Sequence, residues 1–266
     1  MAFKGDQVDK EEAKVEMGEE REKYHFEDFT EDNFRRLLTI AKERYRFIRY
    51  SEAERSDSFL LLRHDVDFSP HRALALAEIE RQEGVCATFF VQLTSFFYNV
   101  FEKEVMEILK EIKYLGHDLG LHFDADVYGI IARESLEAWL EFERKTVESL
   151  IAAEIKSFSY HNPTPEILRH DDSCYAGMVN AYSAYLRENA GYCSDSNGYW
   201  RHDRLEDVLR DGEHKRLQVL VHPGWWQSEP MSPYDRIMRC IEGRAEGQRL
   251  LYDRLLKEHG RKNVGK

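Results

Sequence analysis

Long hydrophobic runs are missing from this 266-residue sequence. A membrane-spanning helix needs roughly 18 to 20 consecutive apolar residues, and no segment comes near that length. The first residues, MAFKGDQVDKEEAK, also lack the apolar core of a secretory signal peptide. We therefore expect no membrane span and a cytoplasmic protein.

An excess of basic residues and closely spaced cysteine pairs are also absent. With 38 basic against 50 acidic residues, the formal net charge is -12. This balance argues against a nucleic-acid partner, because binding to a phosphate backbone relies on clustered Lys and Arg. The cysteines form no CxxC pair, so neither a zinc knuckle nor a redox dithiol is indicated. We expect free thiols at Cys86, Cys174, Cys193 and Cys240.

The apolar content is sufficient for one core, since 42% of the residues are hydrophobic and 12% aromatic. Residues 1–24 are dense in Glu, Lys and Asp and show no sustained apolar period, so we predict a charged, disordered extension there. Residues 25–266 are predicted to form a single catalytic domain.

Short apolar runs alternate with segments of helical period from about residue 25 onward. Candidate strands cover residues 59–64, 85–92, 118–123, 155–160 and 217–222, and candidate helices cover residues 70–84, 105–115, 134–153 and 233–258. Ser69 and Pro70 are a typical cap and first-turn pair for the first of these helices, and Gly84 is expected to end it. Residues 170–200 have no clean period and are expected to form a long irregular excursion. The alternation predicts an α/β fold with a parallel sheet.

Acidic and histidine side chains follow the predicted strands at the points where these end. Asp65 and Asp67 follow the first strand, His122 ends the third, His161 follows the fourth and His222 ends the last. The carboxyl ends of parallel strands open onto one face, so these side chains are expected to converge. Taken singly, each His has an ordinary alternative role, which is a hydrogen bond to a backbone carbonyl.

These residue types suit a metal-dependent hydrolysis. Asp65 and Asp67 share one side of an extended segment, so one carboxylate can bind a metal while the other takes a proton. Their alternative role is to cap the following helix. His122, with Asp124 and Asp126 beyond it, supplies a mixed set of imidazole and carboxylate ligands that favours zinc or another divalent transition metal over calcium.

Five segments resemble, in order, the motifs of the polysaccharide deacetylase family, also called the NodB homology or carbohydrate esterase family 4 group. They are RHDVDFSP with the following ATFFV, then GHDLGLHFDAD, YHNP, SDSNGYW and LQVLVHP. The resemblance spans roughly residues 59–225 and implies a distorted (β/α) barrel. The HDVD and GLHFD variants look like a divergent branch of the family that is associated with bacterial surface-glycan biosynthesis, including lipopolysaccharide biosynthesis.

The resemblance implies roles for particular residues. Asp65 corresponds to the general base and Asp67 to a metal ligand, although the intervening Val66 leaves the two assignments interchangeable. His122 corresponds to the first histidine ligand. Asp126 occupies the position of the second, and Asp124 is the alternative third ligand.

The last three motifs imply the remaining roles. His161 stands where the family has an Arg that orients the base, so it is an orienter, a substrate contact or an extra ligand. His222 corresponds to the general acid, and Asp195 would hold its imidazolium. Trp200, Trp225 and Trp226 are candidates for the wall that contacts a sugar ring.

The predicted function is a zinc-dependent hydrolase that removes an acetyl group from a sugar or sugar nucleotide. Two alternatives stay open. One is an amidohydrolase or deformylase of the same fold that acts on another acyl group. The other is a degenerate member that binds a glycan without turnover. The sequence leaves the oligomeric state undetermined, along with the identity of the sugar and the choice between N- and O-deacylation.

Overall fold

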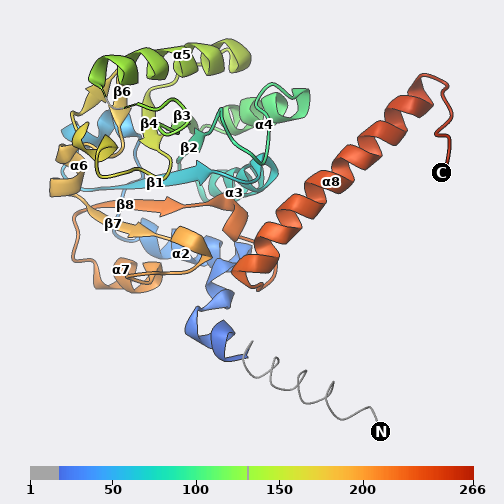
Figure 1. The fold of residues 1–266 in the computed structure, drawn as a ribbon. Coiled ribbons are helices and arrows are strands. Elements are labelled where there is room, and N and C mark those ends of the chain that lie inside the picture. The colour runs from blue at the N-terminus through green and yellow to red at the C-terminus, as the bar shows by residue number, and fades with distance from the viewer. Residues whose placement is uncertain (1–17, 131) are drawn as a thin grey trace, which may run out of the picture.

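The computed structural model describes residues 18–130 and 132–266, and Figure 1 shows its fold. Most of the predicted charged extension, residues 1–17, lies outside the described residues. Residues 18–23 are helical. The four cysteines are unpaired, as expected. Among the described residues, no helix is long and apolar enough to cross a membrane.

One eight-stranded sheet forms the centre of the protein. Its order is β5-β6-β4-β3-β2-β1-β8-β7, and every neighbouring pair is parallel except β5 with β6. The strands are β1 (Phe59–Val66), β2 (Thr88–Val91), β3 (Asp118–Phe123), β4 (Ser157–Tyr160), β5 (Cys174–Tyr175), β6 (Met178–Asn180), β7 (Gly191–Ser194) and β8 (Arg216–Val221). The sheet curls into a half barrel, which confirms the predicted distorted α/β barrel and leaves β5 and β7 as its edges in the described chain.

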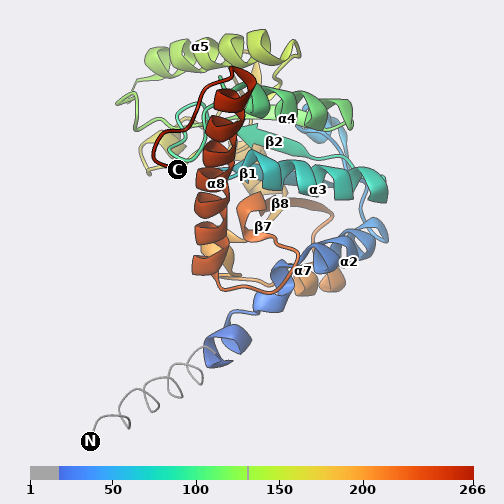
Figure 2. The same cartoon turned by 90° about the vertical axis from the view of Figure 1, so that its right-hand side faces the viewer.

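Helices cover the convex side of the sheet, packed against one another in the order α5, α4, α3, α2, α7 (Figures 1 and 2). The α-helices are α2 (Glu31–Lys42), α3 (Pro70–Glu83), α4 (Lys103–Tyr114), α5 (Arg133–Ile151), α6 (Ala184–Asn189), α7 (Leu205–Asp211) and α8 (Pro233–Glu258). Short 3-10 helices are η1 (Phe26–Phe29), η2 (Tyr50–Arg55), η3 (Ile167–Arg169), η4 (Ser196–Gly198) and η5 (Pro223–Trp225).

The predicted limits of α3 are confirmed, and the local chemistry explains them. The Ser69 hydroxyl accepts a hydrogen bond from the backbone N–H of Arg72 at 3.3 Å, and Pro70 is the first helical residue. Such a cap is worth about 1 kcal/mol of helix stability. Gly84 ends the helix with φ +72°, a left-handed conformation that glycine adopts without the usual Cβ clash.

Strand β1 separates two environments because its side chains alternate between the faces of the sheet. Leu60 and Leu62 belong to the core under the helices, whereas Leu61 packs in a smaller core on the concave side. Arg63 and Asp65 follow Leu61 at spacings of two and share its face. The alternation therefore carries charged side chains into the half barrel, where the site lies.

The opposite face of β1 is held to α3 by a buried polar cluster. His64 Nε2 lies 2.5 Å from Glu80 Oε1, and His117 Nδ1 lies 3.4 Å from Glu80 Oε2. The His64 ring stacks on Phe89 with centroids 4.1 Å apart. All four side chains are buried. The cluster ties α3 to the residues that precede Asp65 and so fixes the end of β1.

The prediction of an irregular excursion over residues 170–200 is wrong. This stretch contains β5, β6, α6 and β7, and it supplies three strands of the sheet. These strands have only two to four residues each, which is too short for an apolar period to show in the sequence. Strands β6 and β7 are held by pairing with β4 and β8, and β5 pairs with the neighbouring β6.

Helix α8 projects from the body on the side toward which β1 and β8 point (Figure 1). Arg236 is its one buried residue; its guanidinium donates to the backbone carbonyls of Gly198 and Phe26, at 2.8 and 3.3 Å. These contacts anchor only the first turns of the helix.

Candidate active site

Three potential metal ligands converge at the carboxyl ends of neighbouring strands. Asp67 follows β1, His122 lies on β3, and His161 follows β4; β3 and β4 are in register with His122 opposite Ser159. One ligand atom from each of the three residues lies within 4.8 Å of the others. This is the one group of three or more acidic, His or Cys side chains with such spacing in residues 18–130 and 132–266.

Asp67 presents an unsatisfied oxygen to this group. Its Oδ1 is buried and makes no hydrogen bond to another described residue, although His122 Nε2 lies only 3.1 Å away. Burial by itself would raise the pKa of Asp67, but contact with His122 and the charge of His222 bring it below its usual value. The carboxylate is therefore ionised and available as a ligand.

His122 is oriented by Ser159, a residue that the sequence analysis did not identify. Ser159 Oγ lies 2.8 Å from His122 Nδ1 and donates to Asp65 Oδ1 at 3.5 Å. Because the hydroxyl proton points to the carboxylate, Oγ accepts from Nδ1–H of the imidazole. This tautomer leaves the lone pair of Nε2 facing Asp67. A metal ligand is commonly oriented in this way through its second ring nitrogen.

His161 and Asp124, two of the predicted site residues, are hydrogen-bonded to each other. His161 Nδ1 lies 3.0 Å from Asp124 Oδ2, and the Gln92 amide lies within 3.4 Å of both. With Nδ1–H donated to Asp124, the lone pair is on Nε2, where it accepts from the Asn162 amide at 3.0 Å. Asp124 Oδ1 instead accepts the backbone N–H of Asp126 at 3.1 Å.

The structure does not bring Asp126 into the group of ligands. Its side chain is exposed, and it is absent from the cluster of Asp67, His122 and His161. His161, which comes from the next strand, lies in that cluster instead. Asp124 is also absent from the cluster, and it contacts one of its members, His161, through a hydrogen bond.

Asp65 lies beside the ligands in a buried ion pair with Arg63. Two guanidinium nitrogens of Arg63 donate to its carboxylate at 2.8 and 2.6 Å, and both side chains are almost completely buried. The second nitrogen also contacts the Tyr182 hydroxyl at 3.2 Å. Burial favours the neutral acid, but the charge and hydrogen bonds of Arg63 outweigh it and lower the pKa of Asp65 to about 2. Asp65 is therefore an anion at neutral pH.

His222 and Asp195 form the opposite side of the site. His222 Nδ1 lies 2.6 Å from Asp195 Oδ1, and the fully buried Asp195 also accepts the indole N–H of Trp226 at 2.9 Å. Burial alone would lower the pKa of His222, but the charge and hydrogen bond of Asp195 raise it to about 9. His222 is therefore protonated at neutral pH, with Nε2 3.8 Å from Asp67 Oδ2.

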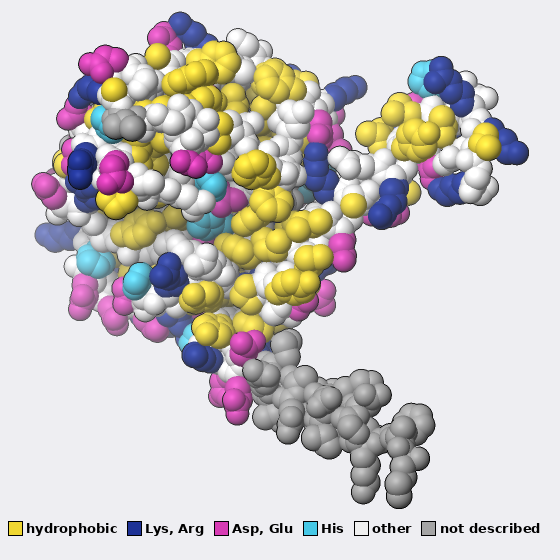
Figure 3. Space-filling view, in the orientation of Figure 1, with side chains coloured by type: hydrophobic (Ala, Val, Ile, Leu, Met, Phe, Trp, Pro, Cys, Tyr) yellow, Lys and Arg dark blue, Asp and Glu magenta, His cyan; other side chains and the backbone are white. Residues whose placement is uncertain are grey.

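A pocket of about 410 Å³ connects these groups to the surface. Asp67, His161 and His222 line it on the polar side, and Trp225 and Phe96 line it on the apolar side. Figure 3 shows histidine and acidic side chains in a hollow bordered by hydrophobic ones. No Lys or Arg is among the described residues that line the pocket.

The aromatic residues predicted to contact a sugar ring have different positions. Trp226 is fully buried, and Trp200 donates its indole N–H to Asp28 at 2.9 Å, so both belong to the packing beneath the site. Trp225 lines the pocket, and its buried indole N–H has no hydrogen-bond partner in the described chain. Phe96, which the sequence analysis did not single out, lines the pocket with 91% of its surface exposed.

Arg63, Ser159 and Gln92 are the polar residues of the site that sequence reasoning missed. A signal existed for Arg63, because a residue two positions before Asp65 on a strand must share its face. A similar signal existed for Ser159, two residues before His161. Nothing in the sequence indicates that Gln92 lies beside His161, since that contact depends on the order of β2, β3 and β4.

Comparison with known proteins gives structural matches only. No family model matches the chain, and no curated protein matches it either. Peptidoglycan deacetylase PdaC from Bacillus subtilis is similar at 13% identity and TM-score 0.43, over 76% of this chain and 96% of that one. The chitin deacetylase from Colletotrichum lindemuthianum is similar at 14% identity and TM-score 0.39, over 69% and 81%.

A carbohydrate esterase family 4 pseudoenzyme from Bacillus anthracis is similar at 13% identity and TM-score 0.39, over 73% of this chain. The present chain spans only 62% of that protein's length. These matches are deacetylases and pseudoenzymes of the group that the sequence motifs resemble. The similarity is one of backbone fold. The chemistry of the candidate site has to be inferred from the side chains of the present protein.

Proposed function

We propose that this protein is a metal-dependent hydrolase that removes an acetyl group from a sugar or sugar derivative. The observation that carries the proposal is the meeting of three kinds of group at the carboxyl ends of the strands. They are a potential metal site of Asp67, His122 and His161, a buried anion at Asp65, and a protonated imidazole at His222. Hydrolysis of an amide or ester uses all three.

The three ligand residues fit a divalent transition metal. One carboxylate and two imidazoles are a donor set that suits zinc, whereas calcium and magnesium prefer oxygen ligands. The unpartnered Asp67 Oδ1 and the oriented imidazole of His122 agree with that assignment. Binding through His161 Nε2 requires the Asn162 amide to turn away. A cation held there would polarise an acyl carbonyl and lower the pKa of a water molecule.

Asp65 is placed to accept a proton from the attacking water. Its carboxylate is ionised and held in one orientation by the two hydrogen bonds from Arg63. The Ser159 hydroxyl and His122 contact the same carboxylate, so Asp65 lies at the edge of the ligand group. As the water oxygen bonds to the acyl carbon, its proton passes to Asp65.

His222 is placed to complete the reaction as the acid. An expelled sugar amine or alkoxide is a poor leaving group unless it is protonated as its bond to the acyl carbon breaks. His222 carries the required proton at neutral pH, because Asp195 keeps its pKa near 9. Asp195 also holds Nδ1, so the proton available to substrate is on Nε2.

The pocket suits an uncharged acylated sugar. Trp225 and Phe96 offer apolar surface of the kind on which a sugar ring packs. The diphosphate of a sugar nucleotide would find no Lys or Arg among the described lining residues. Cytoplasmic residence, zinc as the native metal and a role in surface-glycan biosynthesis stay predictions.

Metal content is the first test. Elemental analysis after zinc reconstitution should give a metal-to-protein ratio near one for the wild type and for Asp126→Asn, and a strongly reduced ratio for His161→Ala. Acetate release from acetylated sugars should follow the metal content. The opposite pattern, with metal lost in Asp126→Asn and kept in His161→Ala, would overturn His161 as the third ligand.

The same experiment separates the alternative functions. No specific metal in the wild type would rule out the hydrolase and favour a degenerate glycan-binding protein. Stoichiometric metal with formate but no acetate released from matched donors would point to a deformylase of the same fold. A His222→Gln variant that binds metal but releases no acetate would support the acid role.

A further inference from the structure

Helix α8 extends well beyond its contacts with the body of the protein. Arg244, near its middle, donates to the Glu102 carboxylate at 2.6 and 3.2 Å. Over residues 246–258 only Asp253 and Leu256 are partly buried, and the other residues are exposed. Isolated helices shorter than about 12 to 15 residues are marginal in water, and helices in proteins are stabilised mainly by packing of an apolar face. The outer half of α8 therefore lacks a packing partner in the described chain.

A largely apolar stripe runs along α8 on a side that does not face the body. Its members follow one another at alternating spacings of four and three residues, as in helices that pair in coiled coils. At about 100° per residue, the stripe is roughly a third of a turn away from Cys240 and Leu251, which line the groove between α8 and the body. Tyr234 and Tyr252 within it are exposed by 71% and 58%, and Figure 3 shows hydrophobic side chains gathered at the outer end of α8. We call it the α8 stripe, and it consists of Tyr234, Met238, Ile241, Ala245, Gln248, Tyr252 and Leu255.

Two copies of this stripe match each other in antiparallel orientation. When the two helices are centred between residues 246 and 247, Ala245 of each copy meets Gln248 of the other near the centre, and apolar residues meet on both sides of it. The apolar pairs are Met238 with Leu255 and Ile241 with Tyr252. The two-fold axis of such a dimer gives every pair twice. From residue 238 to residue 255 the paired length is about 26 Å at 1.5 Å per residue.

Charged residues beside the stripe favour the same arrangement. Glu242 and Arg249 flank it on one side, seven residues apart, so in the antiparallel pair Glu242 of each copy lies beside Arg249 of the other. A shift by one heptad would set Glu242 or Arg249 against its own copy, and a parallel pair would set Arg244 beside Arg249, so both bring like charges together. Arg249 contacts Glu246 of its own helix at 3.2 Å, but such an exposed pair contributes little. The charges are therefore complementary in the antiparallel register that also pairs the apolar residues.

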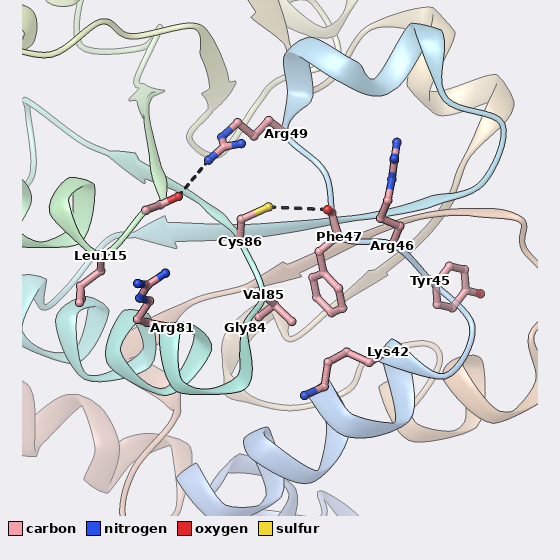
Figure 4. Close-up of a pocket in the computed structure, with 11 residues that line it drawn as sticks. Lys42, Tyr45, Arg46, Phe47, Arg49, Arg81, Gly84, Val85, Cys86 and Leu115 are labelled. Atoms are coloured by element: carbon pink, nitrogen blue, oxygen red, sulfur yellow. Dashed lines mark hydrogen bonds between the residues drawn. The ribbon is translucent and has the colours of Figure 1, made fainter.

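Other surfaces fit the stripe less well. A membrane surface favours amphipathic helices with Lys and Arg on the polar face, whereas residues 246–258 carry three acidic and three basic side chains. The pocket near the start of β1, shown in Figure 4, has a volume of about 500 Å³, against roughly 2,000 Å³ for a helix 10 Å wide over the paired length. Its basic side chains, Lys42, Arg46 and Arg81, point in different directions. This pocket is too small to take α8 of a second copy.

We propose that the protein is a homodimer in which the α8 helices of two copies pair antiparallel through the α8 stripe. The apolar members are buried between the helices, and Glu242 and Arg249 form two symmetric ion pairs beside them. The pairing stabilises the outer half of α8, which the body of its own chain leaves uncovered. The interface involves neither the metal-ligand residues nor His222, so it is independent of the proposed hydrolase.

Sedimentation equilibrium of the full chain tests the proposal. We expect a species of about 63 kDa, twice the 31.5 kDa of one chain, that dissociates on dilution. Tyr252→Glu should raise the dissociation constant about 100-fold or more, because two charges enter the apolar interface, one from each copy. Leu250→Glu is the matched control, since Leu250 is similarly exposed, at 60%, on the opposite side of the same helix, and this substitution should leave the dimer intact. Circular dichroism of both variants checks that the body stays folded.

Charge reversal tests the orientation of the helices. Glu242→Arg and Arg249→Glu should each weaken the dimer several-fold by placing like charges together, and the double variant should regain the wild-type affinity. In a parallel pair, Arg249→Glu would instead strengthen the dimer, and that result would overturn the antiparallel arrangement.

The remaining outcomes contradict the proposal. A wild-type chain that stays at 31.5 kDa at its highest soluble concentration has no such interface. A dimer that survives Tyr252→Glu, or that is weakened equally by Leu250→Glu, is formed by another surface. Co-sedimentation of the monomer with phosphatidylglycerol vesicles would assign the stripe to a membrane. None of these results depends on metal binding or acetate release, so failure of the hydrolase proposal leaves them unaffected.

Discussion

Removal of the charge on Asp195 tests the acid role of His222 most directly. The Asp195→Asn substitution keeps the shape of the side chain but deletes the anion that lies 2.6 Å from His222 Nδ1. Asn can still accept a hydrogen bond through its one oxygen. The imidazolium, however, loses its closest counter-charge, while Asp67 and Asp65 remain farther from it.

The size of the effect follows from the raised pKa. His222 titrates at about 9 against 6.5 for an unperturbed histidine, and at about 1.4 kcal/mol per unit this difference corresponds to about 3 kcal/mol. Burial acts in the opposite direction, so Asp195 supplies more than the net shift. We therefore expect the pKa of His222 in the variant to fall by about two units or more.

Proton NMR of the histidine ring in metal-free protein measures this pKa without interference from a bound cation. Stability gives a second readout, because a group whose pKa is raised on folding stabilises the protein below its unfolded pKa. For His222 that contribution is complete below about pH 6.5 and is lost as pH rises through about 9. The free energy of unfolding of the wild type should fall over this range, and that of Asp195→Asn should fall less.

Asp126→Asn is the matched control, since it removes an exposed carboxylate outside the ligand group. It should leave the titration of His222 and the pH dependence of unfolding unchanged. A wild-type His222 that titrates near 6.5, or an Asp195→Asn variant that still titrates near 9, would refute the reasoning. If the protein releases acetate, the apparent pKa on the alkaline side of its pH–rate profile should shift together with the pKa of His222 measured by NMR.

Three further substitutions test other parts of the site. Arg63→Met leaves a buried carboxylate unpaired, so unfolding experiments should show a loss of about 3 to 5 kcal/mol, and the pKa of Asp65 should rise. Ser159→Ala frees the imidazole of His122, and zinc affinity measured by competition with a chelator should drop by about 10- to 100-fold. Phe96→Ala removes an exposed aromatic side chain, so the melting temperature should stay within about 1 °C while KM for a glycan rises several-fold. An unchanged KM would remove Phe96 from the substrate surface.

The regular elements around the site were predictable from local patterns. The strands Phe59–Val66 and Asp118–Phe123 and the helix Pro70–Glu83 lie within two residues of their predicted limits. Their signals are strong because apolar runs, caps and a terminal glycine agree. The strands between residues 174 and 194 were missed because each is too short to carry a period, and β6 and β7 depend on pairing with β4 and β8.

The positions of the chemical groups were predictable to a similar degree. Asp67, His122, His161 and His222 do meet at the carboxyl ends of the strands, which follows from parallel strand order. The choice of partner within the group was not predictable. The family resemblance gave the third-ligand position to Asp126, with Asp124 as the alternative, but the Asp126 side chain is exposed and His161 from the next strand lies beside Asp67 and His122.

The sequence by itself determined which residues are charged, which strands alternate between two faces, and which side chains reach the carboxyl edge of the sheet. Only the tertiary structure decided that Arg63 neutralises Asp65, that Asp124 orients His161, and that the Asp195 carboxylate keeps His222 protonated. Hydrophobic periodicity and helix capping depend on residues that are close in the chain, so local sequence patterns can predict them. Ion pairing and pKa depend on distances of a few ångströms between residues far apart in the chain, and folding alone sets those distances.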